Sequence, residues 1–399
     1  MRFNIIKEMG NSRGRVGVIE TPHGNIETPA FIVVGTKATV KALTVEQVKD
    51  LGAQALLANT YHLYLQPGDD LIKKAGYIQK FSNWDIPSFT DSGGFQAFSL
   101  GIALNKKVGK VSDKIEKMDM VDIAGSETSG DLVKIDEEGI TFKSIIDGSS
   151  HRFTPERSIE IQHNIGADII FAFDECTSPH ASYEYQREAM NRTHRWAKRS
   201  LEYHKSKEAS KKQALFGIVQ GGRHKDLREE SARTIGMMDF DGFGIGGSFD
   251  KQDIYSAVGW VNDILPKGKP RHLLGIGEPA DLFGGIENGI DTFDCVTPTR
   301  IARNGSLYTR DGKINITNSK YSDDFEKIDS ECGCYTCSHY TRAYISHLFR
   351  AKEMLAATLS SIHNLYFIVN LVKEIRQSML EGKFDEFKNS FLKRYTHLT

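Results

Sequence analysis

Short apolar runs alternate with amphipathic stretches along most of the chain. The apolar runs occupy residues 29–36, 55–61, 87–94, 168–175, 214–222, 242–247, 272–277 and 292–296. The stretches between them include TVEQVKDLG (44–52), TPERSIEIQHNIG (154–166) and KDLREESARTIG (225–236). Strands that alternate with amphipathic helices are typical of a parallel sheet. Eight repeats of this unit predict the α/β class and, within it, a (β/α)8 TIM barrel.

Three regions depart from the repeat. Residues 1–28 predict an antiparallel β hairpin ahead of the barrel. Residues 101–150 are polar, with many Gly and Ser residues and alternating charges, and predict an inserted β-ribbon. The part of this insertion at about 105–131 is either a mobile stretch above the barrel or a surface loop without a role. We therefore divide the chain into residues 1–28, a barrel at 29–310 that includes the ribbon, and a C-terminal subdomain at 311–399 with closing helices.

Polar residues stand at the carboxyl ends of the predicted strands. They are Asn59, Asp91, Asp174, Glu175, Gln220, Gly221, Gly222, Gly246, Gly247, Gly275 and Asp294. In a parallel barrel these ends share one face, where the active sites of such enzymes lie. An Asp after a strand often serves only as the N-cap of the next helix. Three carboxylates from different strands at one face instead indicate a site, because they repel one another unless a ligand supplies donors or positive charge.

The eighth run contains an unusual carboxylate. Asp294 lies in the middle of Thr292-Phe-Asp-Cys-Val296, which otherwise reads as a buried strand that Pro298 ends. Arg300 and Arg303 follow, three residues apart. Burying a carboxylate is costly unless it is paired or used, so the pattern favours a function for Asp294.

Overall charge gives no global nucleic-acid signal, since the formal net charge is −1. From Thr299 onward, however, 15 Lys and Arg residues oppose 11 Asp and Glu residues. This excess allows a nucleic-acid surface on the C-terminal quarter, and it is also compatible with ordinary scatter. The N-terminus has no apolar leader pattern, and we expect no run of about 18 apolar residues that spans a membrane. We therefore expect a cytoplasmic protein with no membrane partner.

Three cysteines crowd into the segment CGCYTC, as Cys332, Cys334 and Cys337. Cytosolic thiols at this density usually bind zinc, because a disulfide needs an oxidising compartment. Spacing alone leaves the fourth ligand open among His339, His347 and His363. Three thiolates and one imidazole complete a tetrahedron, so we expect one structural Zn2+ per chain.

Several motifs, in this order along the chain, resemble those of queuine tRNA-ribosyltransferases of the bacterial type. They are Asp91-Ser-Gly-Gly-Phe-Gln96, Phe173-Asp-Glu-Cys176, Val219-Gln-Gly-Gly222, Gly275-Ile-Gly-Glu-Pro279, Phe293-Asp-Cys-Val296 with Pro298-Thr-Arg300, and the cysteine cluster followed by His363. The resemblance runs from about residue 12 to 380. It implies a tRNA-guanine transglycosylase of queuosine biosynthesis with a zinc-binding insertion in a barrel. Such enzymes, as homodimers, exchange the guanine at wobble position 34 of GUN-anticodon tRNAs for a 7-deazaguanine.

The resemblance also assigns roles to residues. Asp294 matches a nucleophile that attacks the ribose C1′ and forms a covalent intermediate, as in retaining glycosidases. Asp91 matches the general acid/base for the purine. The positions that match purine-binding residues are Asp91, Ser92, Gly93, Gly94, Phe95, Asp174, Gln220 and Gly247. Those that match tRNA-contacting residues are Gly275, Ile276, Gly277, Glu278, Pro279, Ala280, Asp281, Thr299, Arg300, Ile301, Ala302 and Arg303. Those that match zinc ligands are Cys332, Cys334, Cys337 and His363.

One loop departs from the family pattern. After the double glycine the family usually has a Leu-Ala-Val-Gly type run, whereas this chain has Ser248-Phe-Asp-Lys251. The purine edge is common to guanine and its replacements, so discrimination must come from groups that face the seven-position. A carbonyl near Ser248, with Asp250, would favour a cationic aminomethyl group, and the bulk of Phe249 would exclude queuine. We expect the aminomethyl base preQ1, with queuine as the alternative.

Three other functions are less consistent with the sequence. A non-catalytic tRNA-binding paralogue predicts the loss of the nucleophile or of the metal ligands, and both are present. A transglycosylase of the archaeal type usually has a further RNA-binding domain, for which we expect no room before Thr399. A metal-dependent barrel hydrolase needs histidines at strand ends, and no His-x-His follows the first predicted strand.

Overall fold

The computed structural model describes residues 1–97, 133–178, 181–247 and 254–395. Eight parallel strands close into a barrel in the order β10-β11-β12-β13-β14-β4-β5-β6. Their bounds are β4 (Ala30–Val34), β5 (Leu56–Ala58), β6 (Ser88–Thr90), β10 (Ile169–Phe171), β11 (Ala214–Val219), β12 (Gly242–Ile245), β13 (Arg271–Leu273) and β14 (Thr292–Cys295). Every strand overlaps its predicted run, so the predicted barrel is confirmed.

Helices follow these strands, as the amphipathic stretches predict. They are α1 (Val45–Asp50), α2 (Thr60–Leu65), α3 (Asp69–Lys74), α4 (Tyr77–Ser82), α7 (Pro155–Ile165), α8 (Tyr183–Lys205), α9 (Lys225–Gly236), α10 (Ile254–Asn262) and α11 (Pro279–Glu287), with the short 3-10 helix η2 (Glu208–Lys211). Helix α7 shows why these segments are helical. The Thr154 side chain caps its first turn, Pro155 occupies a first-turn position, and Gly166 ends it in the left-handed conformation.

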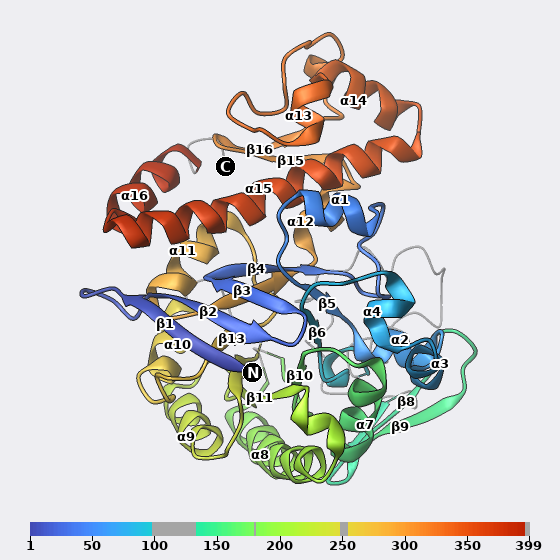
Figure 1. Cartoon of the computed structure of the whole chain (residues 1–399), viewed down its shortest axis with the longest axis vertical. Coiled ribbons are helices and arrows are strands. Elements are labelled where there is room, and N and C mark those ends of the chain that lie inside the picture. Colours follow the sequence, from blue (N-terminus) through green and yellow to red (C-terminus); the bar gives the residue numbers. More distant parts are fainter. Residues whose placement is uncertain (98–132, 179–180, 248–253, 396–399) are drawn as a thin grey trace. The chain divides into compact units, whose positions relative to one another are not determined.

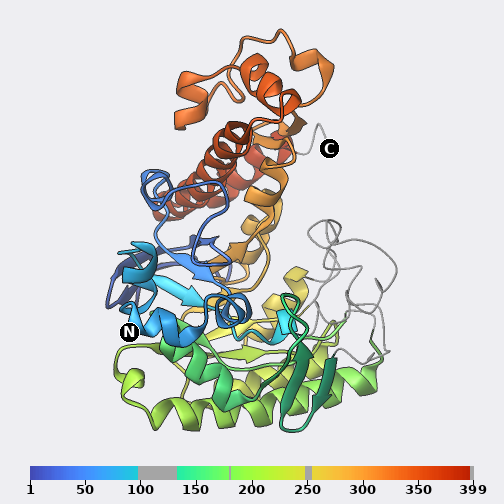
Figure 2. The same ribbon diagram turned by 90° about the vertical axis from the view of Figure 1, so that its right-hand side faces the viewer.

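Two small sheets accompany the barrel. The N-terminal sheet has three strands, β1 (Arg2–Glu8), β2 (Arg15–Thr21) and β3 (Gly24–Thr28), one more than a hairpin. The ribbon of the insertion is an antiparallel sheet of β7 (Val133–Asp136), β8 (Gly139–Lys143) and β9 (Ser150–Phe153). Figure 2 shows this sheet in green beside the long helix α8, where Arg195 donates two hydrogen bonds to Glu137. The stretch at about 105–131 lies outside the described residues.

The C-terminal part is built around one long helix. Its elements are α12 (Thr297–Ala302), β15 (Ser306–Thr309), β16 (Gly312–Asn315), the 3-10 helix η3 (Ser319–Tyr321), α13 (Tyr335–His339), α14 (Arg342–Arg350), α15 (Met354–Glu381) and α16 (Phe384–Tyr395). The β15-β16 hairpin, α13 and α14 lie along α15 (Figure 1). By length and composition alone α15 could cross a membrane. However, 72% of its apolar window is buried inside the protein, as in a core helix.

The chain divides into two compact units. Unit 1 comprises Met1–Phe3, Thr21–His23 and Ala58–Leu274, and unit 2 comprises Asn4–Glu20, Gly24–Leu57 and Gly275–Thr399. In unit 1, the rings of Phe89, Phe171 and His272 pack with centroids 5.3–6.5 Å apart, and all three side chains are fully buried. Such stacked interior side chains fill a barrel, so the functional groups lie at the strand ends.

Candidate active site and metal centre

Asp91 follows β6 and lies in a shell of hydrogen-bond donors. Its carboxylate accepts hydrogen bonds from the Asn59 side chain at 2.5 Å, the Gln96 side chain at 2.8 Å and the backbone N–H of Thr60 at 2.8 Å. The Thr60 hydroxyl donates to the backbone carbonyl of Asp91. Three donors stabilise a negative charge and fix the direction of the carboxylate, which suits a group that exchanges a proton with a ligand.

Asp174, after β10, is nearly enclosed. Its side chain is buried and accepts hydrogen bonds from the Ser92 hydroxyl and from the Gln220 side chain, both at 2.8 Å. Burial raises the pKa of Asp174 above its ordinary value, because the charged form loses solvation. A Cβ at Gly94 would lie 2.7 Å from the Asp174 carbonyl, so only glycine fits there. The motif after β6 and the strand end of β10 therefore pack directly together.

The ends of β11 and β12 join the same network. The Gln220 backbone N–H donates to the Ser231 hydroxyl at 3.2 Å. A Cβ at Gly246 would lie 2.7 Å from Nε2 of the Gln220 side chain. Gly247 has a φ of +111°, which side-chain-bearing residues rarely adopt. The structure thus gathers the predicted purine-binding residues of unit 1, with Phe95 half-buried beside them. The loop residues Ser248 to Asp250 lie outside the described part of the chain.

Asp294 belongs to unit 2 and lies on β14. It is 9% exposed, and its Oδ1 accepts a hydrogen bond from the backbone N–H of Gly275 at 3.0 Å. Burial raises the pKa of the neighbouring Cys295 to about 11. That thiol is therefore protonated at neutral pH and is a poor nucleophile, since the thiolate is the reactive form. Of these two neighbours, the carboxylate rather than the thiol is therefore the candidate nucleophile.

The two segments that resemble tRNA-contacting stretches are also in unit 2. In the first, Gly275–Asp281, Glu278 forms an ion pair with Lys313 at 2.6 Å, and Pro279 begins α11. In the second, Pro298 lies in the first turn of α12 rather than in a loop. Helix α12 buries Thr299 and Ala302 in its packing face, whereas Arg300, Ile301 and Arg303 stay partly accessible. The arginines therefore project from a helix turn that directly follows Asp294.

The three cysteines and His363 converge in unit 2. Their ligand atoms all lie within 4.8 Å of one another, and Nδ1 of His363 is 3.7, 3.5 and 3.4 Å from the sulfurs of Cys332, Cys334 and Cys337. Nε2 of His363 lies 2.6 Å from the carbonyl of Tyr308. A proton on Nε2 leaves Nδ1 as the ligand atom. Of the three candidate histidines, His363 therefore completes a Cys3His group able to bind a metal ion.

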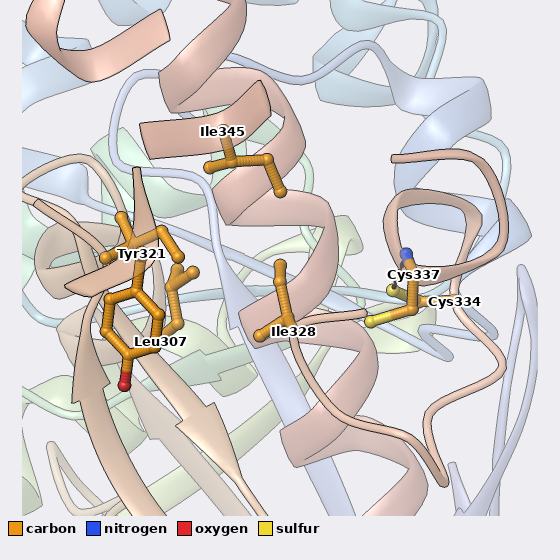
Figure 3. Packing of buried hydrophobic residues seen from close by; sticks show 7 residues of the cluster. Leu307, Tyr321, Ile328, Cys334, Cys337 and Ile345 are labelled. Atoms are coloured by element: carbon orange, nitrogen blue, oxygen red, sulfur yellow. Dashed lines mark hydrogen bonds between the residues drawn. The ribbon is translucent and has the colours of Figure 1, made fainter. Parts of the chain in front are cut away.

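This group lies against a small hydrophobic core of its own. Leu307, Tyr321, Ile328 and Ile345 belong to the same buried cluster as Cys334 and Cys337, with Ile328 drawn between the two cysteines and the other three (Figure 3). Asn364, the residue after His363, accepts a hydrogen bond from the Tyr308 backbone and donates to the carbonyls of Pro298 and Ser306. The metal group is thus tied through α15 to the start of α12, where Arg300 lies.

Sequence reasoning missed several supporting residues. Gln96 ends the quoted motif that begins at Asp91, and Thr60 follows the candidate Asn59, so both positions offered a signal that was not used. Arg228 was missed because an arginine in an amphipathic helix reads as a surface residue, although its helical spacing to Ala232 and Ile235 was a signal. In the structure it is fully buried.

Comparison with known proteins agrees with this geometry. A sequence model described as Queuine tRNA-ribosyltransferase matches residues 10–397. The chain belongs to the queuine tRNA-ribosyltransferase family. It is 47% identical over 398 residues to the queuine tRNA-ribosyltransferase of Caldanaerobacter subterraneus subsp. tengcongensis, covering 99% of this chain and 98% of that protein.

Other bacterial relatives are similar over their full length. The chain is 48% identical over 398 residues to the queuine tRNA-ribosyltransferase of Thermoanaerobacter sp. (strain X514), with 99% and 98% of the two chains covered. It is 45% identical over 390 residues to that of Fusobacterium nucleatum, with 96% of each chain covered. The resemblance inferred from the motifs is confirmed, and with it the class of enzyme, a transferase that acts on tRNA guanosine.

Proposed function

We propose that this protein exchanges the guanine at wobble position 34 of GUN-anticodon tRNAs for a 7-deazaguanine, as a step of queuosine biosynthesis. Asp294 is the nucleophile, and Asp91 is the general acid/base. The observation on which this rests is the contrast between the two carboxylates. Asp294 lies on a buried strand beside an unreactive thiol, whereas Asp91 accepts three hydrogen bonds. Different surroundings suit different chemical tasks.

In the first half-reaction, an Asp294 oxygen attacks the ribose C1′. The bond from C1′ to the purine nitrogen breaks, and its electron pair leaves with guanine, which takes a proton from Asp91. An ester between Asp294 and C1′ remains. The Gly275 N–H that donates to Asp294 orients its carboxylate, and the donors around Asp91 stabilise the charge left after proton transfer.

The second half-reaction reverses these roles. Asp91 takes the proton from the ring nitrogen of the incoming base, whose electron pair attacks C1′ and releases the Asp294 carboxylate. Two inversions retain the configuration at C1′, as in retaining glycosidases. Asp174, with Gln220, Ser92 and Gly247, binds the purine edge, which guanine and its replacement share.

A denaturing gel tests this chemistry directly. Wild-type protein incubated with a GUN-anticodon tRNA should give a tRNA adduct that survives denaturation, and Asp294→Ala should give none. Asp311→Ala, which removes an exposed carboxylate paired with Arg394, serves as the control and should keep the adduct. An adduct of equal yield in Asp294→Ala would assign the nucleophile elsewhere, with Asp91 the next candidate.

We further propose that the ion at the Cys3His group is one structural Zn2+ per chain. Zinc binds sulfur at about 2.3 Å and nitrogen at about 2.0–2.1 Å, and a tetrahedral angle then separates the two donors by about 3.5 Å. The three distances from Nδ1 of His363 to the sulfurs, 3.4–3.7 Å, fit this value. Four protein ligands leave no open position, so the ion holds the fold and does no chemistry on the tRNA.

The accepted base is proposed to be preQ1. This choice depends on the loop of Ser248, Phe249 and Asp250, which lies outside the described residues, so its support is the chemistry of those side chains. Competition of labelled guanine by preQ1 and by queuine tests it. Queuine as the better competitor would reverse the choice.

We propose that the protein acts as a cytoplasmic homodimer. Supporting the dimer, an aromatic row on α13 and α14 reaches the surface, with Tyr335 52% and Tyr344 39% exposed and the Tyr340 and Tyr344 rings stacked at 5.3 Å. Exposed aromatic groups of this kind often mark protein interfaces. Light scattering should give a dimer mass for the wild type and a monomer mass for Tyr344→Glu.

A further inference from the structure

One arginine lies underneath the proposed base-binding loops. Arg228, on α9, is fully buried, and three hydrogen bonds from its side chain go to backbone carbonyls. Nε donates to Gly222 at 2.7 Å, and Nη1 donates to Gly246 at 2.7 Å and to Val219 at 3.2 Å. One planar guanidinium thus joins the segment after β11 to the segment after β12.

The glycines of both loops are fitted around this side chain. A Cβ at Gly247 would clash with Nη2 of Arg228, and a Cβ at Gly221 would lie 2.8 Å from the Arg228 backbone nitrogen. Gly221, Gly222 and Gly247 have φ values of +131°, +57° and +111°, so these loops use conformations open mainly to glycine. Glycine-rich loops lose much conformational entropy when they are ordered. Arg228 supplies fixed donors that keep them ordered.

A buried charge in such a place needs a reason. Burial lowers the pKa of Arg228 to about 9, so it remains protonated at neutral pH. Burying a cation is unfavourable compared with a neutral side chain of similar volume, even when hydrogen bonds offset part of the cost. A neutral side chain could fill the space between the two loops without this cost. The guanidinium offers what other side chains do not, several donors in one rigid plane.

We propose that Arg228 is a positioning residue for the purine base. It holds the loops after β11 and β12 at a fixed separation, so that Gln220 and Gly247 meet the same base together. The inference rests on the proposed function, in that it takes Gln220 and Gly247 to contact the base. Arg228 acts in this role through its hydrogen bonds to the backbone of the two loops. Because the loops are ordered in advance, the base does not bear the entropic cost of ordering them when it binds.

The test separates base binding from the other steps of the reaction. Arg228→Met removes the donors, and Arg228→Lys keeps the charge but loses the rigid fork. Arg233→Met is the matched control, since Arg233 lies on the same helix, is 58% exposed and pairs with Glu229 at the surface. Steady-state kinetics with labelled guanine and tRNA are measured for all four proteins, with melting temperatures and hydrogen exchange of the 219–222 and 246–247 amides.

Arg228→Met should raise the KM for guanine about tenfold or more, while kcat changes less than about threefold and the KM for tRNA less than about twofold. Arg228→Lys should fall between Met and wild type, and Arg233→Met should match wild type. Amide exchange at the two loops should speed up in both Arg228 variants. A KM for guanine within twofold of wild type in a folded Arg228→Met overturns the inference. So does an equal rise in both KM values, which would indicate a general structural defect.

Two further outcomes are decisive. If Arg228→Met does not fold, Arg228→Lys decides, and an unchanged KM for guanine in that variant overturns the inference. If wild-type protein exchanges no guanine, the proposed function fails. Hydrogen exchange of the loop amides then still decides whether Arg228 holds the two loops. Unchanged exchange rates of these amides in Arg228→Lys would refute that role.

Discussion

The two units of this protein bury polar side chains in different ways. In unit 1, Asp91, Asp174 and Gln220 are held by side-chain and backbone hydrogen bonds at strand ends. In unit 2, Cys332, Cys334, Cys337 and His363 point their ligand atoms at a single centre. The first arrangement fixes the direction of polar groups at strand ends, and the second converges on one point that fits a metal ion.

From this difference we expect substitutions in the two units to affect different properties, activity in unit 1 and stability in unit 2. Removing a group from a hydrogen-bonded network at a strand end should reduce activity more than stability, because the barrel core lies elsewhere. Removing a ligand from a closed metal group should reduce stability first, since metal binding there is part of the folding free energy.

Asp91→Asn should lower the rate of base exchange by about 10³- to 10⁴-fold, because an amide cannot transfer the purine's proton. Asn keeps the size of the side chain and a carbonyl that can accept from Thr60, so the melting temperature should change by no more than a few degrees. Labelled-guanine exchange and thermal melting measure the two effects. Exchange at more than a tenth of the wild-type rate would show that unit 1 does not supply the general acid/base.

Cys334→Ser should lose the metal ion and lower the free energy of unfolding by about 4 kcal/mol or more, as expected for loss of a structural metal. Cys176→Ser, at a cysteine outside the group, is the control and should retain about one zinc per chain. Metal analysis and denaturant unfolding are the measurements. A stable, metal-free Cys334→Ser with full exchange activity would contradict a structural role for the group.

Asp291→Ala should lower stability by about 3–5 kcal/mol, the usual cost of breaking a buried ion pair. Asp291 is fully buried and accepts two hydrogen bonds from the guanidinium of Arg15, at 2.9 and 2.6 Å. Asp291 lies three residues before Asp294. Its substitution tests whether a buried carboxylate in unit 2 that lies outside the Cys3His group contributes to stability. Denaturant unfolding measures the loss. If folded Asp291→Ala formed no tRNA adduct under stabilising conditions, Asp291 would be needed for the reaction as well, and its purely structural role would be contradicted.

Asp174→Asn should raise stability at neutral pH by about 1 kcal/mol while lowering base exchange. Because burial raises the folded-state pKa of Asp174, the wild type loses stability as the pH rises through the range between the ordinary and the raised pKa. The asparagine removes that penalty, so its advantage should shrink as the pH falls below the ordinary value. Thermal melting from pH 3.5 to 7.5 follows this change. A variant less stable than wild type at every pH would show that the charge of Asp174 is well compensated.

The barrel could be predicted because its signal is local and repeated. Each strand and helix shows its hydrophobic period within a few residues, and eight copies reinforce one another. Residues 59–61 show the limit of the method. They continue the apolar run of β5, but the structure begins α2 at Thr60, where the Thr60 N–H and hydroxyl both bond to Asp91. A contact with a residue 31 positions away decided that boundary.

The metal group shows a second kind of limit. The cysteine spacing indicated a metal site, but spacing left His339, His347 and His363 equally possible. The family resemblance matched His363, and the fold of α15 shows the physical reason: it directs Nδ1 of His363 toward the sulfurs, while Nε2 lies beside the Tyr308 carbonyl. His339 instead places Nδ1 2.8 Å from the carbonyl of Tyr335.

The sequence by itself determined the fold class, the family and the candidate carboxylates, because these follow from local periodicity and from motifs that keep their spacing. The tertiary structure alone decided which groups support them. Charge alone makes both Arg228 and Arg233 read as surface residues, although the helical period places Arg228 on the same face of α9 as Ala232 and Ile235. The structure shows that Arg228 is buried under two loops, while Arg233, five residues further along, lies at the surface. The burial of a side chain and its hydrogen bonds depend on residues distant in sequence, and only the packing of the folded chain brings those residues together.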